Sequence, residues 1–347
     1  MPTRTRRQRQ VLLLLLSLLP ACLLLALAVG AVTLPFRQVL AVLAGCGGAA
    51  EAGGGANTQL IVLQLRLPRA LLAALVGALL GVSGAAMQGL FRNPLADPSL
   101  IGVSAGASAG ASLVIVFGGV AAADIWQLSM VSLGAFAGGS LAVALVYRLA
   151  TGASGTSVAT MLLAGIAVSA VAGSVTSLLE FSADSEMLRR ISLWRMGGFD
   201  GASYHRVAIA AAVGLAVLLL LPRYSAALNA LLLGESEARH LGIDVARVKN
   251  RLVLLVAAGV GVCVALAGII AFVGLVIPHI MRLLIGPDHR ALLPASALAG
   301  AVLLILADTL ARVIVAPTEL PVGLVTALLG APFFISLLLH RHEYGMR

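Results

Sequence analysis

Serine residues in glycine-rich stretches are the first side chains whose spacing could do chemistry. Ser83 lies in the stretch Gly-Val-Ser-Gly, and Ser104 and Ser108 lie in two overlapping GxSxG motifs. A serine becomes a nucleophile only with a base within hydrogen-bond reach. The one histidine within an expected apolar span is His279. The combination leaves open an intramembrane serine protease that uses Ser83 or Ser104 with His279.

Helix packing is the competing interpretation of the same motifs. The chain contains 38 glycines, so matches of this kind arise by chance. Gly102, Gly106 and Gly110 recur every four residues, and this spacing lets two helices approach closely. The motifs therefore favour packing over catalysis.

Asp308 is the one carboxylate well inside an apolar run. Acidic residues within a membrane commonly serve transport or proton relay, which leaves an ion-coupled secondary transporter open. Arg312 lies four residues further on, at the spacing of an ion pair on one helical face. The sequence leaves both readings of Asp308 open.

Several classes of site are excluded by what the sequence lacks. The three cysteines, Cys22, Cys46 and Cys263, are far apart and form no metal-binding spacing, so no metal site is expected. A nucleotide-binding P-loop requires Gly-Lys-Ser/Thr, but the single lysine, Lys249, is followed by Asn250. Basic residues are not interleaved with aromatic ones, which argues against nucleic acid as a partner.

Composition predicts an all-α integral membrane protein. Of the 347 residues, 60% are hydrophobic and 11% are charged, against about a quarter charged in soluble domains. A spanning helix needs roughly 20 apolar residues. This predicts ten spans, over residues 11–34, 70–91, 99–118, 126–149, 157–181, 206–222, 250–268, 270–286, 290–313 and 320–339. Residues 35–68 are expected to form an external loop, and residues 182–205 an external segment with a short helix over 186–194.

The basic residues predict the orientation of these spans. With the N-terminus inside, fifteen of the 23 basic residues fall in internal segments and eight in external ones. An excess of basic residues marks the cytoplasmic side. Both termini are therefore expected in the cytoplasm, with membrane lipid around the spans.

The segment 231–249 is the longest polar interruption between the spans. Glu235 and Arg239 are spaced for a pair on one helical face. Gly242 suits the residue that ends a helix, and Asp244 suits the N-cap of another. The segment predicts two short helices, which must lie in water, where a soluble partner can contact them.

A weak internal repeat links the two halves of the chain. The stretch 101–104 (Ile-Gly-Val-Ser) resembles the stretch 273–276 (Val-Gly-Leu-Val). Spans 2–5 and 7–10 are separated by one span, so the second set would be inverted relative to the first. Inverted repeats are typical of transporters.

Five stretches together resemble one family, the permease subunits of type II ABC importers for iron siderophores, haem and vitamin B12. The resemblance covers about residues 60–340. The matching stretches are 65–69, 84–98, 234–242, 274–279, and 319–323 with 330–332.

The resemblance implies a homodimer of ten-span subunits, each a single transmembrane domain over residues 1–347, in the bacterial inner membrane. Its partners would be two cytoplasmic ATPase subunits and a periplasmic substrate-binding protein. The chain itself would be no enzyme and bind no cofactor, because ATP and Mg²⁺ would belong to the ATPase. Residues 231–249 would be the coupling helices.

Roles for individual residues follow from the resemblance alone. Contact with the ATPase is expected of Gly234, Glu235, Ser236, Glu237, Ala238, Arg239, Leu241 and Gly242. Docking of the binding protein is expected of Arg66, Arg69 and Arg312. Spans 5 and 10 would flank the pathway, with pathway or gate candidates Ser157, Met161, Glu180, Pro321 and Gly323.

The cargo is the least determined feature. Stretches 237–244 and 286–290 look most like those of iron-chelate and haem permeases, which favours haem or a ferric siderophore. Both stretches are expected in the cytoplasm, away from the cargo, so cobalamin stays the alternative.

Overall fold

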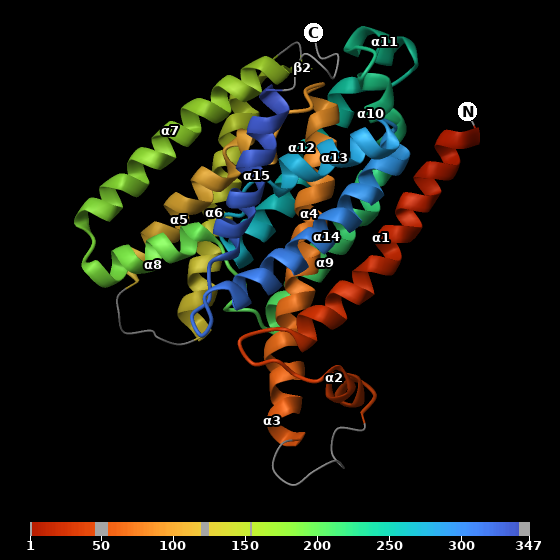
Figure 1. Ribbon diagram of the computed structural model, residues 1–347. Helices are drawn as coiled ribbons and strands as arrows, with labels where there is room; N and C mark the ends of the chain where they lie inside the picture. Colours follow the sequence, from red (N-terminus) through yellow and green to blue (C-terminus); the bar gives the residue numbers. More distant parts are fainter. Residues whose placement is uncertain (1, 46–54, 119–124, 153–154, 340–347) are drawn as a thin grey trace.

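The computed structural model describes residues 2–45, 55–118, 125–152 and 155–339 (Figure 1). The first half of the chain contains α1 Pro2–Ala28, α2 Phe36–Leu43, α3 Gly55–Leu60, a π-helix Ile61–Arg66, α4 Leu67–Leu90, a 3-10 turn Pro98–Ile101, α5 Val103–Phe117, α6 Ile125–Ala150 and α7 Val158–Ser182. The second half contains α8 Ser185–Met196, α9 Tyr204–Leu220, a 3-10 turn Leu221–Tyr224, α10 Ser225–Leu231, α11 Glu235–His240, α12 Val245–Ala267, α13 Val273–Ile285, α14 His289–Ile314 and α15 Val322–Leu339. Strands β1 Thr151–Gly152 and β2 Gly155–Thr156 pair antiparallel between α6 and α7.

Long apolar helices dominate the described residues, as composition predicted. Among these residues, seven helices are long and apolar enough to cross a membrane: α1, α3 continuing through α4, α6, α7, α9 continuing through α10, α12 and α14. The apolar helices α5, α13 and α15 are shorter. Helix α13 is shorter than the expected span because residues 268–272 are not helical.

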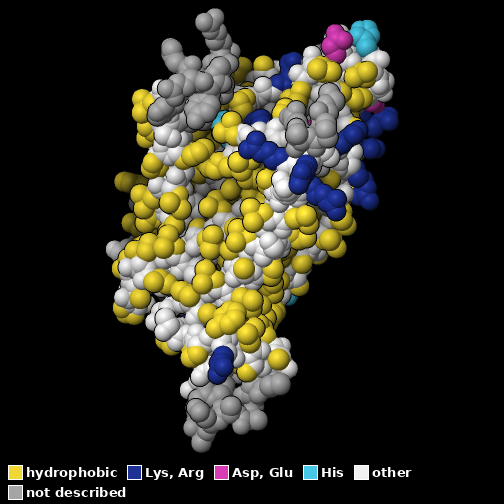
Figure 2. All heavy atoms as spheres, turned by 45° about the vertical axis from the view of Figure 1, so that its right-hand side comes forward, with side chains coloured by type: hydrophobic (Ala, Val, Ile, Leu, Met, Phe, Trp, Pro, Cys, Tyr) yellow, Lys and Arg dark blue, Asp and Glu magenta, His cyan; other side chains and the backbone are white. Residues whose placement is uncertain are grey.

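The two ends of the bundle differ in what they carry. Figure 1 shows the start of α1 together with α10 and α11 at one end, here called the α11 end, and α2 and α3 at the other, here called the α2 end. In Figure 2 the basic side chains visible on one face gather mainly toward the α11 end, while the sides of the bundle are apolar.

The expected external loop over residues 35–68 is wrong for most of its described part. This region forms α2, α3 and the π-helix, and the last two continue directly into α4. An apolar cluster stabilises it, because Val39 and Val42 of α2 pack against Leu27 and Val62. The glycine and alanine content suggested a loop, but burial of these apolar side chains favours helix.

The predicted helix pair over 231–249 needs one correction. Gly242 has a φ of +80° after α11, and the Asp244 carboxylate accepts a hydrogen bond from the Arg247 N–H, as expected. The helix that Asp244 begins, however, is α12, which continues into the bundle without a break. No proline or glycine interrupts its first turns. The second short helix of this region is α10, which precedes α11 and does not follow it.

Helix α4 lies at the centre of the bundle and packs against α14, α13, α12 and α9. Glycine makes the closest approach possible: a Cβ at Gly77 would collide with the Gly300 carbonyl, and a Cβ at Gly300 with the Gly77 carbonyl. A Cβ at Gly84 would likewise collide with Gly274 of α13. Small residues allow such contacts between membrane helices.

Two glycines of the GxSxG motifs, Gly106 and Gly110, make the same kind of contact. A Cβ at Gly106 would lie 2.5 Å from the Gly138 carbonyl oxygen of α6, and a Cβ at Gly110 would collide with the Gly134 carbonyl. The packing interpretation is confirmed for Gly106 and Gly110, whereas Gly102 precedes α5 with a left-handed backbone and a Cβ there would make only ordinary contacts.

The two sets of helices in the expected repeat pack reciprocally. Helix α4, first of one set, packs against α14, third of the other, while α12 packs against α6. Left-handed residues precede the second helix of each set, Gly102 with φ +81° and Phe272 with φ +68°. These backbone positions pair Gly102 with Phe272, two residues from the pairing with Gly274 that the sequence suggested.

Replacing Gly300 with alanine should destabilise the bundle, because the new methyl group must displace the α4 backbone. We expect a loss of about 1–3 kcal/mol in the free energy of unfolding, typical of overpacking. The matched control is Gly173→Ala on α7, where a Cβ meets no atom within 4 Å. Denaturant unfolding in mixed micelles measures both, and equal effects would contradict the close α4–α14 contact.

Candidate functional site

The α11 end presents a compact surface made by the predicted coupling residues. Ser236, Glu237, Arg239 and Gly242 are exposed, while Ala238 is buried beneath them. Glu235 and Arg239 lie 3.7 Å apart, as their spacing predicted. Two apolar side chains flank this helix: Leu233 is 69% exposed and Leu241 64% exposed. A soluble partner can reach these side chains.

Lys249 connects α11 to the bundle. Its side-chain nitrogen lies 2.5 Å from a Glu235 carboxylate oxygen and donates a hydrogen bond of 3.0 Å to the Thr156 carbonyl. The Thr156 hydroxyl donates to the Asn250 side-chain oxygen at 3.1 Å. In the sequence Lys249 stood out only as the single lysine that does not belong to a P-loop. Its contact with Thr156 joins residues 93 positions apart, which spacing alone does not reveal.

Helix α10 has its own polar connection, to the start of α14. The Asn229 amide nitrogen donates to Asp288 at 2.7 Å, and its oxygen accepts the His289 backbone N–H at 2.9 Å. Burial alone raises the pKa of Asp288, but the Arg290 N–H and the Asn229 amide outweigh it and keep this pKa below its usual value. Sequence reasoning missed Asn229, which is a lone polar residue in an apolar run.

At the α2 end, two of the three predicted docking arginines, Arg69 and Arg312, share one charged cluster. Arg69 lies 2.8 Å from Asp308 and 2.6 Å from Glu319, and Arg312 lies 3.2 Å from Asp308. Asp308 is therefore paired with arginines within the bundle, which is one of the two interpretations that the sequence left open. The cluster borders a cavity of 440 Å³ that Arg66, Phe199 and Asp200 also line.

Two of these arginines also contact the end of α1. Arg66 donates to the carbonyls of Leu27 at 2.7 Å and Ala28 at 3.0 Å, and Arg312 donates to the carbonyl of Ala26 at 3.1 Å. Cations stabilise the C-terminal end of a helix, whose last carbonyls lack helical partners.

The three predicted docking arginines are largely buried within the described residues. Arg66 is 7% exposed and Arg312 5% exposed, and the Arg69 side chain is 12% exposed. The end of α1 and the carboxylates of Asp308 and Glu319 cover these groups. Their role in docking stays a prediction.

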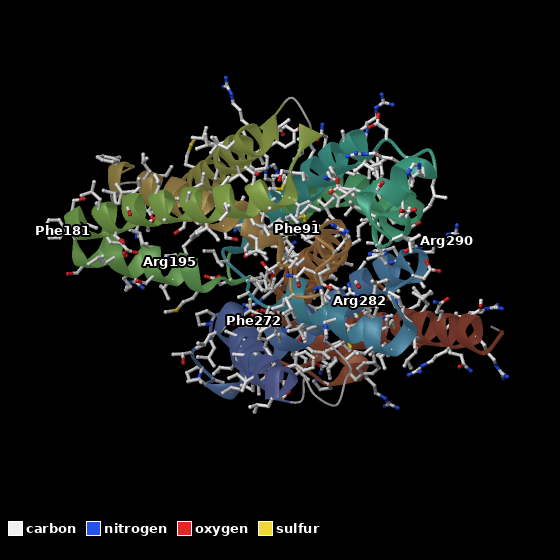
Figure 3. All side chains as sticks on the ribbon, turned by 90° about the horizontal axis from the view of Figure 1, so that it is seen from above. Phe91, Phe181, Arg195, Phe272, Arg282 and Arg290 are labelled. Atoms are coloured by element: carbon white, nitrogen blue, oxygen red, sulfur yellow. The ribbon has the colours of Figure 1, made fainter. Side chains whose placement is uncertain are left out.

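The five pathway candidates divide between the two ends. Ser157 caps α7, its hydroxyl accepting the Thr160 N–H at 3.3 Å, and Met161 is buried one turn later. Glu180, at the opposite end of α7, pairs with Arg195 of α8 at 2.9 Å. Figure 3, seen from above, shows Phe181 and Arg195 on one side of the bundle and Arg290 on the other.

Pro321 directly precedes α15, and Gly323 lies in its first turn. The Gly323 N–H donates to the Gly197 carbonyl at 3.4 Å, and a Cβ there would collide with the Met196 carbonyl. Helix α8 and the glycine that follows it therefore contact both the end of α7 and the start of α15.

The serine protease interpretation finds no catalytic contact among the described residues. Neither ring nitrogen of His279 has a hydrogen-bond partner there, and neither does the Ser83 hydroxyl. The His279 ring instead meets the edge of Phe333, with centroids 6.3 Å apart. A nucleophilic serine requires the base contact that is missing here.

Replacing Asp308 with asparagine should destabilise the protein, because Arg69 and Arg312 would lose the carboxylate between them. Removing one partner of a buried pair costs about 3–5 kcal/mol. The control Glu319→Gln, at the half-exposed side of the same cluster, should cost about 0–1 kcal/mol. Denaturant unfolding compares the two. An Asp308→Asn protein of full stability that had lost transport would instead favour ion coupling.

Comparisons with known proteins agree with this architecture. The FecCD transport family matches residues 16–340. The chain is 46% identical to the hemin transport system permease protein HmuU of Yersinia pestis, over 82% of this chain and 84% of that one. It is also 46% identical to the cobalamin import system permease protein BtuC of Halobacterium salinarum, over 82% and 75%.

Solved structures agree at the level of the fold. An ABC transporter described as of the metal-chelate type, in an inward-facing conformation, is 32% identical, with a TM-score of 0.80 and coverage of 95% of this chain and 99% of that one. The family match, the identities and the shared fold all cover most of the chain, and the chain belongs to the FecCD transport family.

Proposed function

We propose that this chain is the permease subunit of an ATP-driven type II importer that moves an iron chelate, haem or a ferric siderophore, into the cytoplasm. The observation that carries the proposal is the likeness, over nearly the whole chain, to a transporter of the metal-chelate type. The 46% identity to a hemin permease supports it. Equal identity to a cobalamin permease makes cobalamin the second candidate.

The proposed assembly is a homodimer with two ATPase subunits and a periplasmic binding protein. Helix α7 supports a second copy as neighbour, because it carries a run of exposed apolar side chains: Leu163, Ile166, Val171, Leu178 and Phe181. Helix α15 carries others, including Leu328 and Ile335. We propose that α7 and α15 line the pathway between two copies, with an apolar wall that binds cargo weakly enough to release it.

The proposed orientation places the α11 end in the cytoplasm of a bacterial inner membrane. The basic side chains gathered toward this end support it (Figure 2). The binding protein would then dock at the α2 end, near Arg66, Arg69 and Arg312. Because Arg66 and Arg312 also cap α1, Arg69 is the docking residue whose change disturbs α1 least.

The proposed mechanism is alternating access without covalent chemistry by the permease. ATP binding would close the ATPase subunits and move α10 and α11. The polar contacts of Lys249 and Asn229 connect these helices to α7 and α14. Helix α8, which joins α7 to α15, would carry the change across the α2 end, so that the two gates open in turn.

The cargo is tested by ATP hydrolysis in proteoliposomes that hold the permease, its ATPase and its binding protein. We expect haem or one ferric siderophore to stimulate hydrolysis and cobalamin to have no effect, because each binding protein presents one cargo. Stimulation by cobalamin alone would replace the iron chelate as cargo. Failure of the ATPase to associate at all would contradict the importer proposal.

The contact with the ATPase is tested at Leu241. Replacing this exposed side chain with aspartate should weaken ATPase association about 30-fold, which corresponds to the loss of a ~2 kcal/mol interface anchor. Stability of the permease should not change, because Leu241 is already exposed. The matched control is Leu241→Met. Unchanged association of Leu241→Asp, measured by surface binding, would place the ATPase elsewhere.

A further inference from the structure

Lys249 is the only lysine in the chain and is 4% exposed. It lies near the start of α12, where the neighbouring cations Arg247 and Arg251 are exposed. An ammonium group buried in this way is costly unless charged and polar partners surround it. Lys249 has two partners, the Glu235 carboxylate and the Thr156 carbonyl.

These two partners belong to different functional regions of the molecule. Glu235 is the first residue of α11, the helix of the exposed coupling surface. Thr156 ends β2 and directly precedes Ser157, the N-cap of α7. A single side chain therefore joins the start of α11 to the start of α7, although the two lie almost 80 positions apart in the printed sequence.

Thr156 is itself held on several sides. Its hydroxyl donates to Asn250 at 3.1 Å and lies 3.0 Å from the hydroxyl of Thr151, its partner in the hairpin. The Ser157 N–H donates to the Ala150 carbonyl at 3.0 Å. The hairpin and the start of α7 therefore move together with any displacement of the Thr156 carbonyl.

The surroundings of Lys249 leave room for such a displacement. A cavity of 360 Å³ lies beside it, lined by Arg92, by Gly155 and Thr156 of β2, by the start of α7, and by Glu235 and Lys249. The unbranched lysine side chain can follow Glu235 by rotation about its carbon chain while keeping its ion pair.

We propose that Lys249 is the positioning residue that transmits movement of α11 to the hairpin and the start of α7. The proposal rests on the importer function proposed above and assigns the step that links ATPase closure to the cytoplasmic side of the pathway. A purely structural lysine would stabilise the bundle but would leave the coupling of uptake to ATP hydrolysis unchanged.

The test uses the full-length permease reconstituted with its ATPase and binding protein, as wild type, Lys249→Met, Lys249→Arg and Glu235→Gln. The matched control is Arg247→Met, an exposed cation on the same helix whose ion pair is with Asp244. Uptake per ATP hydrolysed should fall between about 2- and 30-fold in Lys249→Met. Lys249→Arg should restore most of it, and Arg247→Met should not change it.

A second readout follows the movement itself. Spin labels at the exposed His240 on α11 and, separately, at Gly152 in the hairpin report ATP-dependent distances between the two copies of the assembly, after the native cysteines are replaced by alanine. In Lys249→Met the distance between His240 labels should still change on ATP binding, and the distance between Gly152 labels should not.

The outcomes separate this proposal from the one on which it rests. No uptake by the wild type with any cargo would contradict the importer function. Wild-type uptake with unchanged coupling and hairpin movement in Lys249→Met would overturn only the role of Lys249. If Lys249→Met does not fold, Glu235→Gln decides, because Glu235 is half-exposed: coupling as in the wild type would overturn the proposal.

Discussion

Burial of charge within an apolar helix bundle is the constraint on which the rest of this structure depends. A charged side chain can enter such a bundle only with partners that replace water. At the α11 end Lys249 meets Glu235 and a backbone carbonyl. At the α2 end Arg69 and Arg312 share Asp308. Each group joins elements distant in sequence, so the pairing determines which helices must stay together.

Between these charged ends, the bundle is held by close backbone contact. Glycines let α4 approach α14 and α13, and let α5 approach α6, at distances that no side chain would permit. Close packing of this kind is how helices associate in lipid, where the apolar surroundings offer no hydrophobic driving force. A tightly packed centre with polar connections at its ends is suited to moving as whole helices, as alternating access requires.

In the proposed assembly, movement would begin at the α11 end of the bundle. A partner at that end would act on α10 and α11, each of which has a polar connection to a different long helix. At the other end, the arginines expected to meet a binding protein also cap α1. Binding there would therefore act on the position of α1 as well as on the docking surface.

The sequence by itself determined the membrane class, the approximate positions of the apolar helices, the family, the end of α11 and the start of α12. Local rules suffice for these features, because a capping residue such as Asp244 or a pair such as Glu235 and Arg239 acts within a few residues of its partner. The tertiary structure alone decided that residues 55–66 are helical and that α12 continues without a break. It also decided that Arg66 and Arg312 are buried and that Lys249 reaches Thr156. Those features depend on contacts between residues far apart in the chain, whose partners the spacing of a sequence does not specify.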